Sequence, residues 1–559
     1  MESKFAAVLK TSLRFKTSLV ITGTILIILL AGSLTKANAG PVLFFSDLTS
    51  GPNTGWNQSS TQGAAVTIWG LNLGASDGTS SVNVGGVPIA SNDPTYIAEW
   101  ATTGVANGVA RKMQRITFWL KSTMPSGAQN ITVTTPAGTS NALPFTIRNG
   151  NIYFIAASGG NNSYNGKYNS FTSGSSGPWA SLTYASPQTN SALVPGDIIY
   201  VRAGAYTTQI NFTDSPTVGT ASMPWALVGY PTEWPTFNSS LFTGTEVYWT
   251  FAKFKFTAGS NSMEPWGDHI RMVGNWMTGV TAGGEVGIID FAGGTTGVGD
   301  QVYGNYFYGC GNNEYTHNIY INSQFGQLSY VDIGWNEFSN TVNSTSPPHG
   351  GIIDMRTANG GSPSNHIYIH DNFFHDSPDE PLYQSNEGGP VTYVYFYNNV
   401  MWNLTSPEAV LVIIQADSNS LYANNTLYQG VSATGPVYNI NTSTAIVKNN
   451  LIYGYSGESA FTSVNGGGLN SQNDLYYNIS PPSGSGVTIS GTVTGNPLFV
   501  NTSTPDLHLQ SGSAAINAGV STSPTVTLDS DGLSRPQATA YDIGAYEYII
   551  LPSPPSSLR

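Results

Sequence analysis

The sequence predicts an all-β chain built mainly as a right-handed parallel β-helix, a solenoid of stacked coils, preceded by a small β-sandwich. An Asn recurs in the second half of the chain at intervals of 23 to 36 residues, which is a solenoid period. Each Asn closes a short phrase of alternating apolar and polar residues. Gly is abundant, at 63 residues, and charged residues make up only 9%, which suits a chain rich in turns. The recurring residues are Asn275, Asn305, Asn336, Asn372, Asn399, Asn425, Asn450 and Asn473.

Each phrase is typical of a strand with one buried face, and stacking the units buries one continuous apolar column. We expect each Asn to lie at a turn and its amide to bond to the copies in neighbouring coils, with Phe254 in the place of the Asn in an earlier coil. The predicted inward residues are Ile270, Met272, Val331, Ile333, Ile367, Ile369, Val394 and Phe396.

The N-terminus has the pattern of an export signal. Residues 1–39 start with several basic residues, continue with an apolar stretch that is short for a membrane span, and end in Ala37-Asn38-Ala39, a small-x-small cleavage site before Gly40. We therefore expect a secreted, periplasmic or cell-surface protein, and an uncleaved membrane anchor is the alternative. Cys310 is the only cysteine, which excludes a disulfide framework and a metal site built on several cysteines.

The net charge of −13 argues against nucleic acid as a partner, and against an anionic membrane once the signal is cleaved. A solenoid that is capped at both ends is compatible with a monomer.

Residues 40–148 differ from the repeat, because alternating strands are separated there by Gly, Pro and Asn turns. The stretches VTIWGLNLG, VNVGG and ITVTTPAGTSNALPFTI resemble the immunoglobulin-like IPT/TIG domain. The resemblance implies a β-sandwich that acts as a spacer or a binding accessory.

Residues 149–500 form the predicted β-helix. Its opening contains GDIIYV at 196–201, GAY at 204–206 and Pro224-Trp225, and it resembles the entry coils of exported pectate-lyase-like and alginate-lyase-like β-helix proteins. Residues 501–550 look like the terminal element of that superfamily, which is expected to cap the open end of the solenoid. The Pro- and Ser-rich tail 551–559 is expected to be disordered.

A second strand in each coil carries candidate chemistry. If Ile289, Ile321, Ile353 and Leu382 point inward, one outward column on successive coils contains Asp290, Tyr320, Asp354 and Tyr383. Arg356 lies two residues beyond Asp354 on the same face. A shift of the register by one residue would turn this column inward.

Titratable and aromatic residues are concentrated in the same region. The candidate catalytic residues are Asp354, Arg356, His349, His370, Asp290 and Tyr320. Residues expected to stack on or orient sugar rings are Tyr368, Tyr383, Tyr395, Tyr397 and His375. A Ca²⁺ ion would be held by Asp371, Asp376, Asp379 or Glu380. The alternative for each of these residues alone is a solvated surface position or a turn.

Three functions are compatible with these residues. The first is a polysaccharide lyase that cleaves a uronate-containing glycan by β-elimination, with Arg356 on the uronate carboxylate and a His or Tyr as base. The second is a glycoside hydrolase that uses Asp290 with Asp354, or Asp354 with Asp379 or Glu380. The third is a non-catalytic glycan-binding or cell-surface adhesion protein. The resemblance favours the lyase. The pectate-lyase-like and alginate-lyase-like enzymes, however, use a Lys or Arg base beside Ca²⁺, and this face has almost no Lys.

Overall fold

The computed structural model describes residues 40–549, with gaps at 105–111, 209, 212–217, 239–241, 245–246, 258–262, 282–285, 292–295, 314, 324–325, 343–350, 358–363, 387–390, 407–408, 414–418 and 432–434. The predicted signal segment 1–39 and the tail 551–559 lie outside the described residues. In the described part of the chain no helix is long and apolar enough to cross a bilayer.

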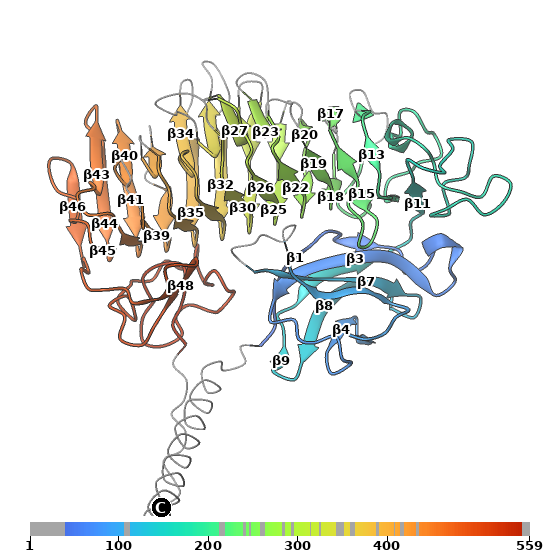
Figure 1. Cartoon of the computed structure of the whole chain (residues 1–559), viewed down its shortest axis with the longest axis horizontal. Helices are drawn as coiled ribbons and strands as arrows, with labels where there is room; N and C mark the ends of the chain where they lie inside the picture. Colours follow the sequence, from blue (N-terminus) through green and yellow to red (C-terminus); the bar gives the residue numbers. More distant parts are fainter. Residues whose placement is uncertain are drawn as a thin grey trace, which may run out of the picture. The chain divides into compact units, whose positions relative to one another are not determined.

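Residues 42–147 form two small β-sheets around one apolar core, a unit called here the sandwich (Figure 1). One sheet has the order β1-β3-β7-β6, and the other has the order β2-β10-β8-β4-β5 with β9 beside β8. The resemblance of this region to the IPT/TIG domain remains a prediction. The strands are β1 (Val42–Ser46), β2 (Ser50–Gly51), β3 (Gln62–Leu71), β4 (Ser81–Val84), β5 (Val87–Ala90), β6 (Ile97–Thr102), β7 (Gln114–Lys121), β8 (Gly127–Thr135), β9 (Gly138–Thr139) and β10 (Leu143–Ile147), with a 3-10 turn η1 (Trp56–Gln58) after β2.

From residue 152 the chain winds into a parallel β-solenoid with three sheets, as the repeat predicts (Figure 1). A second 3-10 turn, η3 (Leu182–Ala185), packs into the solenoid core near its beginning. The first sheet contains β11 (Ile152–Ile155), β12 (Ile198–Val201), β15 (Trp225–Gly229), β18 (Trp249–Ala252), β21 (Arg271–Val273), β25 (Gln301–Tyr303), β29 (Asp332–Gly334), β32 (Ser364–His370), β35 (Val391–Tyr397), β38 (Leu421–Ala423), β41 (Thr444–Lys448), β44 (Gly468–Gln472) and β46 (Val487–Ser490), with the side strands β24 (Thr296–Val298) and β28 (Gln327–Ser329).

The other two sheets follow the first in each coil. The second sheet contains β13 (Ala205–Tyr206), β16 (Thr236–Phe237), β19 (Lys255–Thr257), β22 (Trp276–Thr278), β26 (Tyr306–Tyr308), β30 (Glu337–Ser339), β33 (Phe373–His375), β36 (Val400–Trp402), β39 (Thr426–Tyr428), β42 (Leu451–Tyr453) and β45 (Leu475–Tyr477). The third sheet contains β14 (Ile210–Asn211), β17 (Phe242–Gly244), β20 (Met263–Pro265), β23 (Val286–Phe291), β27 (Thr316–Asn322), β31 (Ile353–Thr357), β34 (Leu382–Asn386), β37 (Leu411–Ile413), β40 (Tyr438–Asn441) and β43 (Phe461–Val464).

The core is a set of apolar columns, one from each sheet, because equivalent inward residues repeat in every coil. Met272, Val302 and Ile333 stack along the first sheet, and Phe307, Phe338 and Phe374 stack along the second. All eight residues predicted to point inward are fully buried. Burying each such side chain contributes roughly 1.5–3 kcal/mol relative to leaving it exposed, so the columns stabilise the stack throughout its length.

The predicted Asn repeat forms a continuous amide ladder in the turn between the first and second sheets. The side-chain oxygen of Asn305 accepts from both the backbone N–H and the side-chain amide of Asn275, each at 2.9 Å. The same pattern repeats through Asn336, Asn372, Asn399, Asn425 and Asn450. As expected, Phe254 occupies the position in the earlier coil, where its N–H donates to Asn275.

One detail of the predicted ladder is wrong. The last rung is Asp474 rather than Asn473, because Asn450 donates to Asp474 Oδ1 at 2.6 and 3.0 Å. The left-handed backbone conformation belongs to the residue before each rung and not to the rung itself. Asn473, with φ of 53°, has this preceding position in the last coil.

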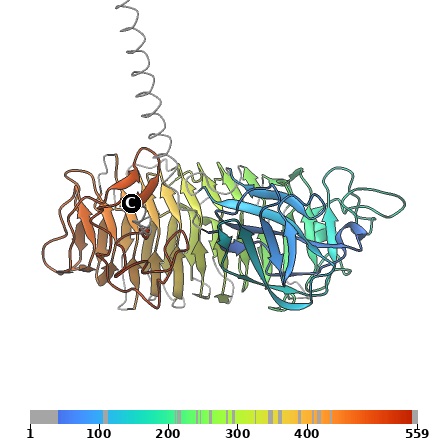
Figure 2. The same ribbon diagram turned by 90° about the horizontal axis from the view of Figure 1, so that it is seen from below.

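The sandwich packs against the outer face of the first sheet in the early coils (Figure 2). Phe154, Tyr200 and Val273 of that face belong to the same apolar cluster as the sandwich core. The Tyr200 hydroxyl donates to the carbonyl of Ala65 in β3 at 2.8 Å, and Arg271 donates to the carbonyl of Asp47 at 2.6 Å. Residues 41–550 therefore form one compact unit.

The segment after β46 contains β47 (Phe499–Asn501) and β48 (Asp506–Leu509) and was expected to cover the open end of the solenoid. Its contacts lie along the side instead, at the last coils (Figure 2). Leu507 and Ile543 pack with Leu451 and Leu475 of the second sheet. The side-chain amides of Asn398, Asn449 and Asn473 donate to backbone carbonyls of this segment at 2.7 to 2.9 Å. Residues 496–549 are called the C-terminal flank below.

Candidate active site

The predicted outward column lies in register on the third sheet. Asp290 pairs with Tyr320, Tyr320 with Asp354, and Asp354 with Tyr383 on four successive strands. The inward residues of this row are Ile289, Ile319, Ile353 and Leu382. The sequence predicts Ile321 in this row, but Ile319 takes that place, and Ile321 pairs with Met355 two residues further along the strand. Asp290, Tyr320, Asp354 and Tyr383, together with Glu264, are called the column below.

Close packing between coils holds the two tyrosines of the column. The Tyr383 side chain lies against Gly351, where an added Cβ would come within 2.7 Å of the Tyr383 Cβ. Tyr320 lies against Gly287 in the same way, at 2.8 Å. A side chain at either glycine would clash with the backbone and Cβ of the neighbouring tyrosine, so the two glycines permit the close approach of these strands.

His317 joins the column through Asp354. Its Nε2 lies 3.1 Å from Asp354 Oδ2, its Nδ1 lies 3.0 Å from the Gly351 carbonyl, and its ring stacks on Tyr320 with centroids 5.1 Å apart. Burial lowers the pKa of His317 to about 4, so the imidazole is neutral at pH 7. A carbonyl only accepts, so Nδ1 carries the proton and donates to Gly351. Nε2 then carries no proton, so its contact with Asp354 is a hydrogen bond only when the Asp354 carboxyl is protonated.

The alternation of apolar and polar residues does not identify His317 as a residue that lies beside the column. It stands two residues before Ile319, so a strict two-residue period places it inside the coil. The strand is irregular at this point, because the N–H groups of Asn318 and Ile319 both donate to the carbonyl of Ile352, at 3.0 Å each. The irregularity turns His317 toward Asp354. No pattern in the sequence indicates it.

Asp290 is a buried carboxyl next to another carboxyl. Met263 pairs with Ile289, so the neighbouring Glu264 stands beside Asp290 and extends the column by one coil. Burial raises the pKa of Asp290 to about 7, and the charge of Glu264 adds to the rise, while a hydrogen bond from the Gly287 N–H opposes it. Asp290 is thus half protonated near neutral pH.

Only some residues of this face are accessible to solvent. Asp290, Tyr320 and Asp354 are buried, whereas Glu264, Tyr383 and Arg356 are partly exposed. Arg356 stands two residues along β31 from Asp354 and pairs in register with Asn322 and Ser385. It is the only Arg between residues 272 and 534, so the single guanidinium of these coils lies beside the column. Asp379 is also near, since its charge acts on His317.

The other predicted residues lie on different faces. His370 is on the first sheet, where Asp332 and Asp371 hold it at 2.8 and 2.7 Å and raise its pKa to about 10 against the opposing effect of burial. His375 is on the second sheet, between Glu337 and Asp376. Each of these imidazoles is already held between two carboxylates.

Tyr368, Tyr395 and Tyr397 are on the first sheet, with Tyr368 stacked on Tyr395 at 5.1 Å and Tyr397 stacked on His370. His349 lies outside the described residues.

The predicted Ca²⁺ ligands do not converge. Asp371 contacts His370, Asp376 contacts His375, and Glu380 accepts a hydrogen bond from Ser406 at 2.7 Å. Within the described ranges no three His, Cys, Asp or Glu side chains are placed to hold a metal ion.

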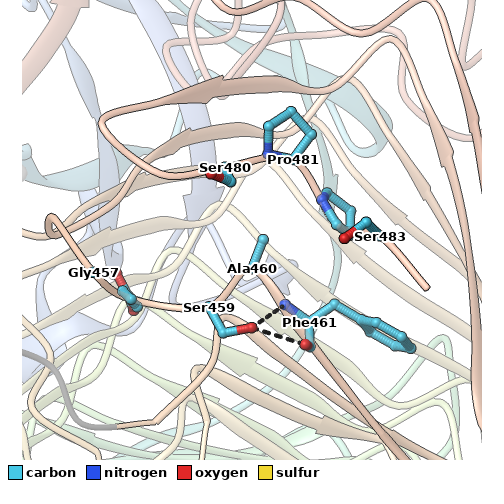
Figure 3. Close-up of a pocket in the computed structure, with 9 residues that line it drawn as sticks. Gly457, Ser459, Ala460, Phe461, Ser480, Pro481 and Ser483 are labelled. Carbon is cyan, nitrogen blue, oxygen red and sulfur yellow. Dashed lines mark hydrogen bonds between the residues drawn. The ribbon is translucent and has the colours of Figure 1, made fainter.

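A hollow of about 280 Å³ lies away from the column (Figure 3). Its lining comes from residues 457–461 and 480–483, near β43, which is four strands along the third sheet from β31. The Ser459 hydroxyl within it hydrogen-bonds to the backbone of Phe461. Glu458 is the titratable residue of the lining, and burial raises its pKa to about 7. One carboxyl without a second chemical partner in the lining does not make this hollow a reaction site.

Comparison with known proteins gives fold neighbours only. No family model matches the sequence, and no curated protein matches it. Among solved structures, pectate lyase Pel9A is 16% identical with a TM-score of 0.40, over 71% of this chain and 96% of that one. The PL6 family alginate lyase AlyGC is 14% identical with a TM-score of 0.31, over 62% and 59%. The Yersinia enterocolitica family 28 exopolygalacturonase is 10% identical with a TM-score of 0.30, over 82% and 99%. None of these likenesses indicates a reaction for this chain.

Proposed function

We propose that this protein is an exported polysaccharide-cleaving enzyme, and that it acts as a lyase on a uronate-containing glycan at the column on the third sheet. The observation that carries the proposal is the set of groups brought together around Asp354: the neutral His317 at 3.1 Å, Tyr320 on the neighbouring strand and Arg356 two residues away. A rigid sheet face that combines a guanidinium, a phenol and a histidine–carboxylate pair has the groups that β-elimination needs.

Each group has a role in that reaction. Arg356 binds the uronate carboxylate, since a guanidinium matches a carboxylate with two parallel hydrogen bonds, and it thereby acidifies the C5 proton. Tyr320, as its phenolate, takes the C5 proton; the C4=C5 double bond forms as the C4–O bond breaks, and the Tyr320 phenol returns that proton to the leaving glycosidic oxygen. The pair of His317 and Asp354 positions Tyr320, because His317 stacks on the Tyr320 ring.

A hydrolase is the second candidate, and Asp290 favours it. A carboxyl with a pKa of about 7 is partly protonated at neutral pH, as a general acid must be. Asp354 is two strands away, about 9–10 Å at the backbone. This separation is close to the range of about 6.5–9.5 Å found in inverting enzymes. Glu264 is one strand away from Asp290, so that pair is closer to the separation of about 5–5.5 Å of retaining enzymes.

An assay with polymers of both charge classes separates the candidates. The purified protein is incubated with polyuronates and with neutral polysaccharides, with and without EDTA. Unsaturated uronate, seen by its ultraviolet absorbance, together with new reducing ends supports the lyase. New reducing ends alone support the hydrolase. No cleavage of any polymer, with binding retained, would replace both by the non-catalytic glycan binder.

Substitutions at the column test its assignment. We expect Arg356→Ala and Asp354→Asn each to lower kcat/KM on the order of 100-fold or more, because the first removes the partner of the uronate carboxylate and the second removes the carboxyl oxygen that His317 contacts. Arg356→Lys keeps the charge without the two-pronged geometry and should fall between wild type and Arg356→Ala. Thermal melting checks that the variants are folded. Full activity in both Arg356→Ala and Asp354→Asn would move the site elsewhere.

A further inference from the structure

The third sheet ends before the other two sheets of the solenoid. Among the described strands its last member is β43, whereas the first sheet continues with β44 and β46 and the second sheet with β45. After β45 the chain passes through residues 478–486 to β46 without forming a third-sheet strand. The place of that strand, about 4.8 Å beyond β43, is therefore left to a loop.

The hollow of about 280 Å³ lies at this place (Figure 3). One wall is the segment 457–461 that leads into β43, and the other is the stretch 480–483 of the loop. Figure 3 shows Ser459 and Ala460 on one side of the hollow and Pro481 and Ser483 on the other. Its volume is just below the range of about 300–1,000 Å³ typical of pockets for drug-sized ligands, so it suits a ligand of one ring.

Part of the lining is apolar. Pro481 and Pro482 contribute their rings from the loop, and Phe461 contributes from β43. Phe461 pairs with the buried Tyr438 of the preceding coil and packs against the solenoid core, but it is itself only partly buried. These side chains offer the apolar contact that the faces of a small ring need.

The rest of the lining is rich in hydroxyl groups. Ser459, Ser480 and Ser483 all line the hollow and are exposed. A serine hydroxyl both donates and accepts hydrogen bonds, as does a sugar hydroxyl. The combination of apolar walls with hydroxyl groups matches a sugar ring, which has C–H groups on its faces and hydroxyl groups at its edge.

The charge of the lining selects against acidic sugars. Glu458 is the single ionisable residue of the lining, and its Oε2 accepts the Tyr455 N–H at 2.9 Å. Burial raises the pKa of Glu458 to about 7. The sequence has no Lys or Arg between Lys448 and Arg535. A uronate carboxylate in the hollow would lie beside Glu458 without a cation from the lining, which is unfavourable for both groups.

We propose that this hollow is a subsite that binds one uncharged sugar unit of the glycan. The inference rests on the proposed function, because it takes its ligand class from the column. The hollow adjoins β43, four strands from β31, which is about 19 Å along the third sheet. It therefore holds a sugar unit at a distance from the bond that is cleaved. The substrate is then a mixed glycan, with a uronate at Arg356 and a neutral unit at the hollow.

Blocking the hollow tests binding separately from the reaction. Ser480→Trp and Ser483→Trp each add an indole to the lining, and Ser490→Trp adds it at an exposed position of β46 outside the lining as a matched control. Native gel electrophoresis is run through gels that contain xylan, mannan or β-glucan, and retardation is measured. We expect at least one of these neutral polymers to retard the wild type and Ser490→Trp but neither blocking variant. Thermal melting checks that all variants are folded.

Two results of this measurement would overturn the subsite. One is that none of the neutral polymers retards the wild type. The other is that both folded blocking variants are retarded as strongly as Ser490→Trp. Retardation by polygalacturonate or alginate should instead be lost in Arg356→Ala and kept in Ser480→Trp, because the uronate binds at the column.

Kinetics on a mixed glycan connect the subsite to the proposed reaction. On a polymer with uronate and neutral units that the wild type cleaves, we expect Ser480→Trp to raise KM about tenfold with kcat nearly unchanged, which corresponds to about 1.4 kcal/mol. An unchanged KM in both blocking variants would overturn the subsite and leave the proposed function standing. If no polymer is cleaved but the neutral polymers retard the protein as expected, the subsite stands and the proposed reaction fails.

Discussion

At the scale of single residues, burial decides which carboxyls of the column carry protons. In the sequence, Asp290 is an ordinary polar residue of a strand with alternating apolar and polar residues. In the folded protein its pKa nevertheless rises to about 7. The cause is desolvation beneath the outer face of the third sheet, with Glu264 adding a like charge. A group with this pKa changes its charge within the physiological range, so its proton affects both chemistry and stability.

This shift predicts how stability changes with pH. Because the folded pKa of about 7 lies above the unfolded value of 3.8, the folded state keeps a proton that the unfolded state releases. Stability is therefore fully present below pH 3.8 and falls as pH rises toward 7. Asp290→Asn has no such proton, so it should match wild type at pH 4 and exceed it at pH 8 by up to about 4 kcal/mol. Urea unfolding at both pH values measures this.

The exposed carboxyl Asp77 gives the control for that experiment. Asp77→Asn should follow the wild-type profile between pH 4 and pH 8, because its carboxyl is exposed in the sandwich. If Asp290→Asn also follows the wild type across this range, Asp290 is ionised in the folded protein, and its role as a general acid fails with it.

At the scale of elements, the repeat predicts the ladder almost completely and fails only in the last coil, where the rung is an Asp that directly follows an Asn. Asn473 and Asp474 are both short, and counting the period cannot tell which of them points inward. The structure decides through the backbone: the residue before each rung is left-handed, and Asn tolerates that conformation well. Asp474 then takes the rung, buried, with its pKa raised to about 7 by desolvation.

The same reasoning explains which part of the site the sequence could show. Alternation separates inward from outward residues, so the register of Asp290, Tyr320, Asp354 and Tyr383 follows from it. Alternation does not say which of three sheets a strand joins. His370 and His375 are close to Asp354 in sequence, yet each coil sends them to the first and second sheets. Proximity along a solenoid sequence therefore overstates proximity in space.

The ladder predicts a large loss of stability for one buried amide. In Asn372→Ala, the N–H and side-chain amide of Asn336 lose their acceptor, and the Ile333 carbonyl loses its donor. Each buried polar group left unsatisfied costs about 1–3 kcal/mol. We expect unfolding free energy to fall by at least about 3 kcal/mol in urea titrations. Asp474→Asn, which keeps the acceptor for Asn450, should lose nothing at pH 7; an equal loss in both variants would contradict this account.

At the scale of the whole molecule, the sandwich and the C-terminal flank dock on the same corner of the solenoid. That corner is the left-handed position before each ladder rung. Phe44 of the sandwich stacks on Trp335 at this corner, and Phe45 packs against it with its ring tilted, at 5.7 and 5.5 Å between centroids. From Asn398 onward the C-terminal flank contacts this corner, because the Asn398 side-chain amide donates to the Leu528 carbonyl. Gly532 of the flank also approaches Val42 of β1, so the two additions meet there.

A buried ion pair fastens the C-terminal flank. Arg535 and Glu547 are both nearly inaccessible and 2.8 Å apart, and the Arg535 guanidinium also donates to the Gly544 carbonyl and to Asn398 Oδ1. Arg535 thus ties two parts of the flank to each other and to a coil of the solenoid. Removing one partner leaves a buried charge without its counter-ion, which typically costs about 3–5 kcal/mol.

Limited proteolysis tests this fastening. We expect Arg535→Ala to make residues 496–549 the first region cut, at protease concentrations that leave the wild-type chain intact, because the flank loses the Arg535 hydrogen bond to Asn398 and the ion pair with Glu547. Arg535→Met combined with Glu547→Gln removes both charges and should resist cleavage better than Arg535→Ala, since no unpaired charge remains buried. Cleavage that starts elsewhere, or the same resistance in wild type and Arg535→Ala, would show that apolar packing of Leu507 and Ile543 alone holds the flank.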